Sequence, residues 1–137
     1  MLPGHDMNDM SATQRELSTL FELAAAKNIS ESDIIAAEPE MARFLRAVED
    51  HPDERAFVAA LMFDALSRYR KCPWNLVQYC MYRLRWPEVL AFVRKVKHED
   101  VEKRGARSLT IWRSIIDAFG DNWEDAKYFT HLKGPHE

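Results

Sequence analysis

The stretch CPWNLVQYCMYRLRWPEV, residues 72–89, contains two of the four tryptophans of the chain and both of its cysteines. Its two prolines, Pro73 and Pro87, stand fourteen residues apart. Proline suits the first position of a helix, because the N–H that it lacks has no partner there. We therefore predict one helix from Pro73 to Arg85 and a second that starts at Pro87 with almost no loop between them.

These two predicted helices differ in how their apolar residues are distributed. The apolar positions of the first helix are Leu76, Val77, Cys80, Met81 and Leu84. A helix that is apolar on most of its circumference is usually central and buried. The second helix, to about Arg104, is amphipathic with an apolar stripe of Val89, Leu90, Val93 and Val96. The stretch is thus predicted to be mainly a buried helix between two proline corners.

The remainder of the chain also carries a helical pattern. It has four glycines and no alternating runs of β-branched residues, so strands have little support. Apolar residues recur instead with a period of about 3.6 residues. Ser11 and Gln14 form an S-x-x-Q capping box that opens a helix to about Lys27, and Pro39 is predicted to interrupt the chain. Further helices are predicted at about 30–35, 41–48, 52–71, 109–119 and 121–132.

The expected fold class is all-α, with about seven short helices. Short connections make successive helices pack antiparallel or at steep angles. Two arrangements stay open: antiparallel stacked pairs, similar in architecture to HEAT and armadillo repeats, and a compact irregular bundle. With 137 residues and 47% hydrophobic content, the chain fits one core-forming domain. We predict a disordered N-terminus at 1–10, a single helical domain at 11–132 and a frayed tail at 133–137.

Composition also bears on location and redox state. No apolar run approaches the roughly 20 residues of a membrane span, so no membrane contact is expected. The opening MLPGHDMNDM has no apolar core of a signal peptide, so we expect a soluble cytoplasmic protein. Cys72 and Cys80 are eight residues apart without a C-x-x-C motif, and both are predicted to be free thiols.

Charge is distributed unevenly along the sequence. Residues 1–67 carry five Lys/Arg and thirteen Asp/Glu, residues 68–107 carry eleven and four, and residues 108–137 carry three and five. A basic segment of this kind favours an anionic partner, or attraction to the acidic part of the same chain or of a second copy. The expected partner is another protein with an acidic patch, and a homo-oligomer is an alternative.

The basic segment supplies the candidate binding site. Arginine beside aromatic rings is typical of protein-binding surfaces, because the rings supply contact area and the guanidinium supplies forked donors. Trp74 and Trp86 adjoin the two prolines, where we expect part of each ring to be exposed. A solvated face of ordinary surface cations is the simplest alternative. The candidate partner-binding residues are Trp74, Arg83, Arg85, Trp86, Arg94, Lys95 and Lys97.

Enzyme chemistry has little support in the sequence. There is no H-E-x-x-H, no P-loop and no G-x-S-x-G, so no catalytic residue, metal or cofactor is predicted. Asp64 lies near an apolar helix face, where Arg68 at i+4 is expected to pair with it. Asp64, Cys72 and His98 are the groups on which an enzyme hypothesis would depend.

The function expected from these patterns is that of a non-catalytic helical protein-interaction module, of the inhibitor, adaptor or toxin-neutralising type. The alternative is nucleic-acid binding through residues 68–107, because the same cations could neutralise phosphates or stack on a base. The net charge of −3 and the acidic ends of the chain make this alternative less favoured.

Overall fold

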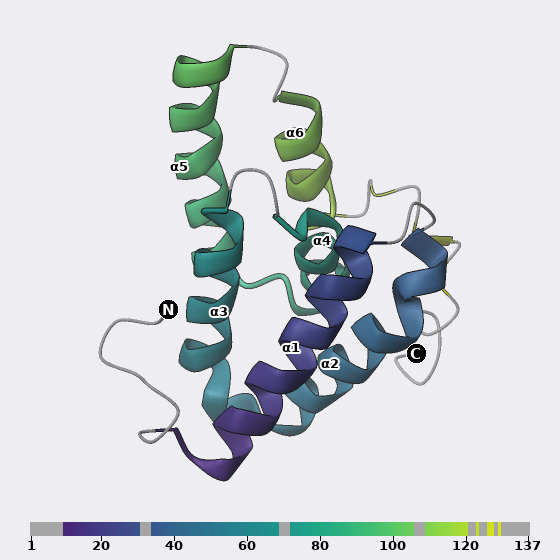
Figure 1. Cartoon of the computed structure of the whole chain (residues 1–137). Coiled ribbons are helices and arrows are strands. Elements are labelled where there is room, and N and C mark those ends of the chain that lie inside the picture. The colour runs from purple at the N-terminus through teal and green to yellow at the C-terminus, as the bar shows by residue number, and fades with distance from the viewer. Residues whose placement is uncertain are drawn as a thin grey trace. The chain divides into compact units, whose positions relative to one another are not determined.

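Helices make up all the regular secondary structure in the part of the chain that the structure describes. The computed structural model describes residues 10–30, 34–68, 72–105, 109–120, 123, 126–127 and 129. The elements are α1 (Ala12–Ser30), η1 (Ile34–Ala37), α2 (Glu38–Asp50), η2 (Pro52–Glu54), α3 (Arg55–Leu66), α4 (Trp74–Leu84), α5 (Pro87–Arg104) and α6 (Leu109–Asp117), where η marks a short 3₁₀ helix (Figure 1). The all-α prediction is confirmed. Most of the predicted helix at 121–132, and nearly all of the predicted ends at 1–10 and 133–137, fall outside the described residues.

The chain divides into two compact units, Met1–Pro73 and Trp74–Glu137. The first unit contains α1, α2 and α3, and the second contains α4, α5 and α6. The HEAT-like stacking and the single-domain organisation stay predictions.

Capping interactions fix the start of α1. The Gln14 backbone N–H donates to Ser11 Oγ at 3.0 Å, and the Ser11 N–H donates to Gln14 Oε1 at 3.2 Å. These reciprocal bonds are the predicted capping box, which satisfies donors that the first turn of a helix leaves free. Gln14 Nε2 also donates to Glu54 Oε1 at 3.0 Å. The start of α1 is therefore tied to η2.

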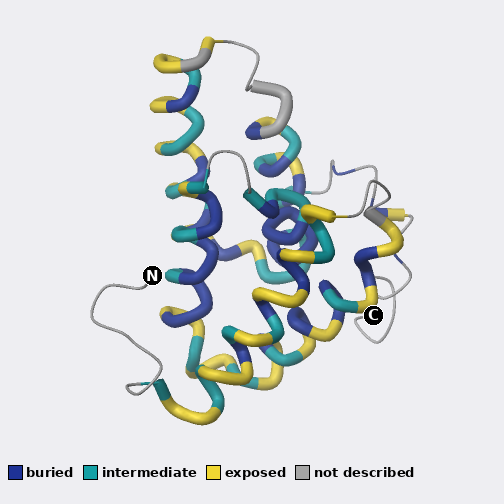
Figure 2. Tube along the Cα trace, in the orientation of Figure 1, coloured by how far each residue is buried: buried dark blue, intermediate teal, exposed yellow. Residues whose placement is uncertain are grey.

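The core of the first unit forms where α1 packs against α2 and α3. The rings of Phe21 and Phe44 meet edge to face at 5.2 Å, and both side chains are fully buried. Pro39 lies in the first turn of α2, so it begins this helix where the sequence predicted an interruption. The buried apolar residues of α1 and α2 are Leu17, Phe21, Ala24, Ala25, Met41, Ala42, Phe44, Leu45 and Val48 (Figure 2).

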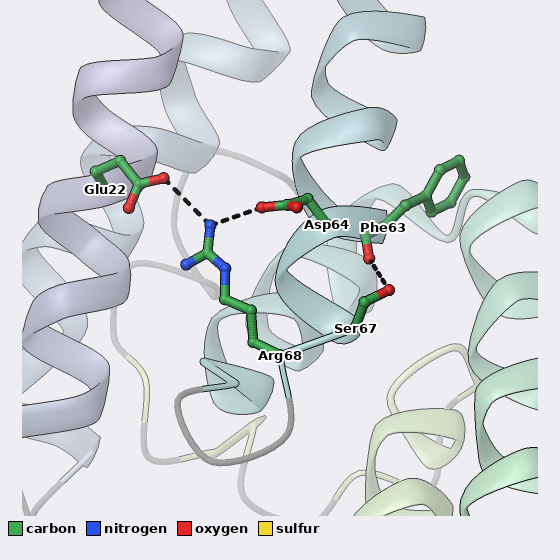
Figure 3. Close-up of polar contacts among 5 residues, drawn as sticks. All are labelled: Glu22, Phe63, Asp64, Ser67 and Arg68. Carbon is green, nitrogen blue, oxygen red and sulfur yellow. Dashed lines mark hydrogen bonds and ion pairs between the residues drawn. The ribbon is translucent and has the colours of Figure 1, made fainter. Parts of the chain in front are cut away.

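Helix α3 is shorter than predicted. It ends at Leu66, whereas the apolar pattern predicted a helix to about Lys71. Ser67 stands in the turn that follows, and its hydroxyl donates to the Phe63 carbonyl at 2.9 Å (Figure 3). Such back-bonding is one way in which serine competes with regular helical geometry. Residues 69–71 lie outside the described part.

The corner between α4 and α5 consists of Arg85 and Trp86. Arg85 has a left-handed backbone with φ of +49°, and its N–H donates to the Met81 carbonyl at 2.9 Å. Trp86 is extended, and its carbonyl accepts the Leu90 N–H at 3.2 Å. Pro87 then occupies the first turn of α5, as predicted. The left-handed residue closes α4 so that α5 can start after two residues.

In the second unit, α6 packs against both α4 and α5. The indole Nε1 of Trp112 in α6 donates to Asp100 Oδ2 in α5 at 2.8 Å. The Gln78 amide in α4 donates to the carbonyl and the hydroxyl of Ser114 in α6 at 2.8 and 2.6 Å. Buried polar groups need such partners, so these bonds fix the places at which the helices meet.

Candidate functional site

Arg85 is the most exposed of the candidate residues at the corner. Its Nε donates to the Tyr82 carbonyl at 3.2 Å, and its guanidinium carbon lies 5.6 Å from the centroid of the Tyr82 ring. Arg83, one residue before the end of α4, is half-buried. The Tyr82 ring, packed in turn on Trp123 at 5.5 Å, orders the Arg85 side chain. Arg85 thus presents a pre-positioned cation at the surface.

The two tryptophans do not join this corner at the surface. Trp86 is only 7% exposed, so the prediction that its ring is partly exposed is wrong. The left-handed Arg85 and the extended Trp86 together set the direction of this side chain, and that geometry turns it into the interior. Trp74 is half-buried at the first position of α4, about 15 Å along the helix axis from Leu84. Trp74 is therefore distant from the corner.

The three candidate cations of α5 do not share one face of the helix. Arg94 and Lys95 are exposed and Lys97 is half-buried. Because successive residues are turned by about 100°, Arg94 and Lys97 lie about 60° apart, while Lys95 points about 160° from Lys97. The candidate set therefore separates into Arg94 and Lys97 on one side and Lys95 on the other.

Arg94 and Lys97 lie in a row with two apolar residues. Leu90, Arg94, Lys97 and Val101 are spaced by four, three and four residues, which places them along one side of α5; we call this row the α5 flank. Leu90 and Val101 are half-buried, so each leaves some apolar surface in contact with water. Within the described ranges, neither Arg94 nor Lys97 has an ion-pair partner. The flank thus combines partly exposed apolar area with two unneutralised cations.

The side of α5 that carries Lys95 has mixed charge. Glu88, Glu99 and Glu102 are exposed on the same side. His98 Nε2 lies 3.1 Å from Glu102 Oε1, and both of these side chains are well exposed. A phosphate-binding surface gains affinity from each phosphate neutralised, and interleaved carboxylates oppose that gain. This arrangement disfavours the nucleic-acid alternative along α5.

Asp64 is held by Arg68, as predicted. Arg68 Nη2 donates to Asp64 Oδ2 at 2.8 Å and lies 3.5 Å from Glu22 Oε2, so one guanidinium joins α1 to the end of α3 (Figure 3). The hydrogen bond from Arg68 lowers the pKa of Asp64 below its usual 3.8, against a smaller opposing contribution from burial. A general acid needs the opposite shift. The role that this geometry supports for Asp64 is therefore structural, as the partner of Arg68 in a salt bridge of the first unit.

The Asp64→Asn variant should lose part of this interaction at neutral pH. We expect the free energy of unfolding to fall by about 0.5–1 kcal/mol, since the pair is partly exposed. The folded-state pKa of Asp64 is lowered. The contribution of its salt bridge to the free energy of unfolding is therefore fully present above the unfolded-state pKa and disappears as the pH falls through the lowered value. Urea unfolding of both proteins from pH 7 down to about 3 tests this. A difference that stays constant with pH would contradict the assignment.

The Cys72 thiol is not activated as a nucleophile in the structure. Burial raises the pKa of the Cys72 thiol to about 12, so the reactive thiolate is scarce at neutral pH. Cys72 and Cys80 are both free thiols, as predicted. No group of three His, Cys, Asp or Glu side chains in the described part is placed to hold a metal ion.

Within the described residues, no helix has the length and apolar character that a membrane span requires.

Three buried polar residues escaped the sequence analysis: Glu38, Gln78 and Asp100. Asp100 is 6% exposed and Gln78 is 2% exposed, and both bridge to α6. A signal for Asp100 was available, because it extends the apolar stripe of Val89, Val93 and Val96 by one further turn. Gln78 has no comparable signal, since its partners Ser114 Oγ and the Ser114 carbonyl come from a distant part of the chain.

No protein-family model, curated protein or solved structure matches the chain. The function must therefore be inferred from the surface of the molecule itself, and the α5 flank with the Arg85 corner is its most informative part.

Proposed function

We propose that the chain is a non-catalytic protein-interaction module that binds an acidic partner surface through the α5 flank. The observation that carries the proposal is the placement of Arg94 and Lys97 in one row with the partly exposed Leu90 and Val101. Roles as an inhibitor, an adaptor or a toxin-neutralising protein all fit such a module.

The two kinds of side chain in the flank would contribute differently to binding. Apolar area removed from water contributes roughly 25 cal/mol per Å², which Leu90 and Val101 supply. Arg94 and Lys97 would add specificity and a faster association with a surface of opposite charge. Arg94 also offers a planar fork of donors that suits a carboxylate. An acidic surface with apolar side chains between its carboxylates is thus the expected complement.

The Arg85 corner supports the same proposal. Leu90 lies one turn after Pro87, so the α5 flank starts close to the corner in which Arg85 is ordered over Tyr82. A partner that covers the first turns of α5 would therefore also meet Arg85. Less conformational entropy would be lost on binding, because the Arg85 side chain is already held in place.

Affinity capture from lysate of the source cell tests the proposal. The Arg94→Glu/Lys97→Glu variant reverses the charges of the flank, and the Lys95→Glu/Lys103→Glu variant makes two charge reversals elsewhere on the exposed surface of the same helix. Wild type and the second variant should retain the same protein, while the first variant should retain at least about tenfold less of it, as two lost contacts of about 0.7 kcal/mol would give.

Each capture is repeated with nuclease, and mass spectrometry quantifies what is retained. If both variants lost the retained protein equally, binding would depend on net charge alone, which would contradict a binding site at the α5 flank. Equal retention by both variants would also contradict it. Material that disappears on nuclease treatment would replace the proposal with nucleic-acid binding.

A further inference from the structure

A concentration of exposed apolar side chains marks the end of α1. In the described residues, the large hydrophobic side chains that are exposed are Leu23 at 52%, Ile29 at 46% and Ile35 at 45%. All three fall within thirteen consecutive positions of the sequence. Single exposed apolar residues are ordinary, whereas a group of them on a folded protein marks an interaction surface.

The geometry of α1 places two of these residues on one side of the helix. Ala26 is exposed and lies between Leu23 and Ile29, each about 60° away around the helix axis. Exposed positions recur along the whole of α1 (Figure 2). We call Leu23, Ala26 and Ile29 the α1 face.

Acidic residues adjoin the α1 face toward the start of the helix. Glu16 and Glu22 are exposed on that side, and Glu22 keeps 56% of its side chain in water although it shares Arg68 with Asp64. Lys27, toward the end of the helix, is half-buried. The face is thus an apolar centre with carboxylates at one end, which favours an apolar and basic partner.

The chain itself carries a surface of that description. The α5 flank has Arg94 and Lys97 between the apolar Leu90 and Val101, and it extends over about 17 Å of helix. The α1 face with its acidic end, from Glu16 to Ile29, extends over about 20 Å. The two surfaces are therefore opposite in charge and similar in length.

The charges of the two units agree with this pairing. Met1–Pro73 carries thirteen Asp/Glu and eight Lys/Arg, a net charge of −5. Trp74–Glu137 carries nine Asp/Glu and eleven Lys/Arg, a net charge of +2. The first unit of one molecule and the second unit of another therefore attract each other at long range.

We infer that the α5 flank of one copy binds the α1 face of a second copy, so that the acidic partner of the proposed function is the chain itself. This inference rests on the proposed function of the α5 flank. Because the two surfaces differ, a single contact is heterologous, and a dimer held by one contact keeps one unused α1 face and one unused α5 flank. Association then continues beyond the dimer as the concentration rises, unless the geometry closes a ring, of which a reciprocal dimer with both contacts made is the smallest.

Sedimentation velocity of the purified full chain tests the inference with two variants. Leu23→Ser/Ile29→Ser disables the α1 face, and Arg94→Glu/Lys97→Glu disables the α5 flank. All these side chains except Lys97 are exposed, and circular dichroism checks that both variants fold. The Lys95→Glu/Lys103→Glu protein is the matched control and should associate like wild type.

The expected result is a wild-type mass that rises with concentration, between about 10 and 500 μM, and whose association weakens about tenfold as salt rises from about 50 to 500 mM. Each of the two variants alone should be a monomer. An equimolar mixture should form a dimer that grows no further, because each variant supplies the one surface that the other lacks.

Other outcomes would overturn the inference. A wild-type monomer at every concentration would remove it, yet the lysate capture with the flank variant would still test the proposed function independently. Association of the flank variant alone would show that the α1 face pairs with another surface, for example with itself. A mixture of variants that stays monomeric would show that the two surfaces do not bind each other.

Discussion

Replacing Trp112 by alanine is expected to lower the free energy of unfolding by about 3–5 kcal/mol. The side chain is 8% exposed, and it lies in α6, the helix that packs against both α4 and α5. The substitution removes a large apolar volume and also the donor to Asp100 Oδ2 at 2.8 Å. A loss of this size is a large part of the 5–15 kcal/mol that folded domains typically have.

The Trp112→Phe variant separates the two contributions. Phenylalanine keeps most of the ring volume but cannot donate to Asp100, so we expect it to cost about 1–3 kcal/mol, the range for the loss of a buried hydrogen bond. Urea unfolding followed by far-ultraviolet circular dichroism gives both values. If Trp112→Phe were as stable as wild type, the bond to Asp100 would contribute nothing to folding. If it were as unstable as Trp112→Ala, packing would contribute little.

Phe21→Ala should have an effect of similar size on the first unit. Phe21 is fully buried and meets Phe44 edge to face at 5.2 Å, so its removal leaves a cavity between α1 and α2. We expect a loss of about 3–5 kcal/mol. A double-mutant cycle with Phe44→Ala should give a coupling of about 0.5–1.5 kcal/mol, the range expected for an aromatic pair. Strict additivity would contradict a direct contact between the rings.

The distribution of tryptophan makes this measurement specific. All four tryptophans lie in Trp74–Glu137, so their fluorescence reports on the second unit, whereas circular dichroism reports helices of both units. Comparison of the two signals for Phe21→Ala therefore shows whether the loss stays within the first unit. Transitions that coincide would indicate that the two units unfold together.

Much of the local structure was predictable because its signals are local. Ser11 and Gln14 are three residues apart and form the capping box that their spacing indicates. Pro87 begins α5 because proline fits the first turn of a helix, where the N–H that it lacks has no partner. Asp64 and Arg68 are one helical turn apart, and their salt bridge follows from that spacing.

The candidate site was harder to predict, because the direction of a side chain depends on distant contacts. The exposure predicted for Trp86 was wrong, since Arg85 adopts a left-handed backbone that glycine usually supplies and that no local signal indicated. Leu23 and Ile29 are exposed because α2 and α3 cover the opposite side of α1, which only the tertiary fold decides. The separation of Lys95 from Lys97, by contrast, follows from helical periodicity alone.

The two free thiols allow local opening of the unmodified protein to be measured by alkylation. Cys80 has no exposed surface, so an alkylating reagent can modify its thiol at an appreciable rate only after the structure opens around it. Cys72 is half-buried and lies two residues before α4, and the raised pKa of its thiol slows its reaction with the reagent. The alkylation rate of Cys80 therefore measures how often the middle of α4 opens, without any introduced label, and Cys72 serves as an internal reference. Equal rates would mean that the middle of α4 admits the reagent as readily as the half-buried Cys72 is reached, and a much slower rate at Cys80 would mean that α4 stays closed around its thiol.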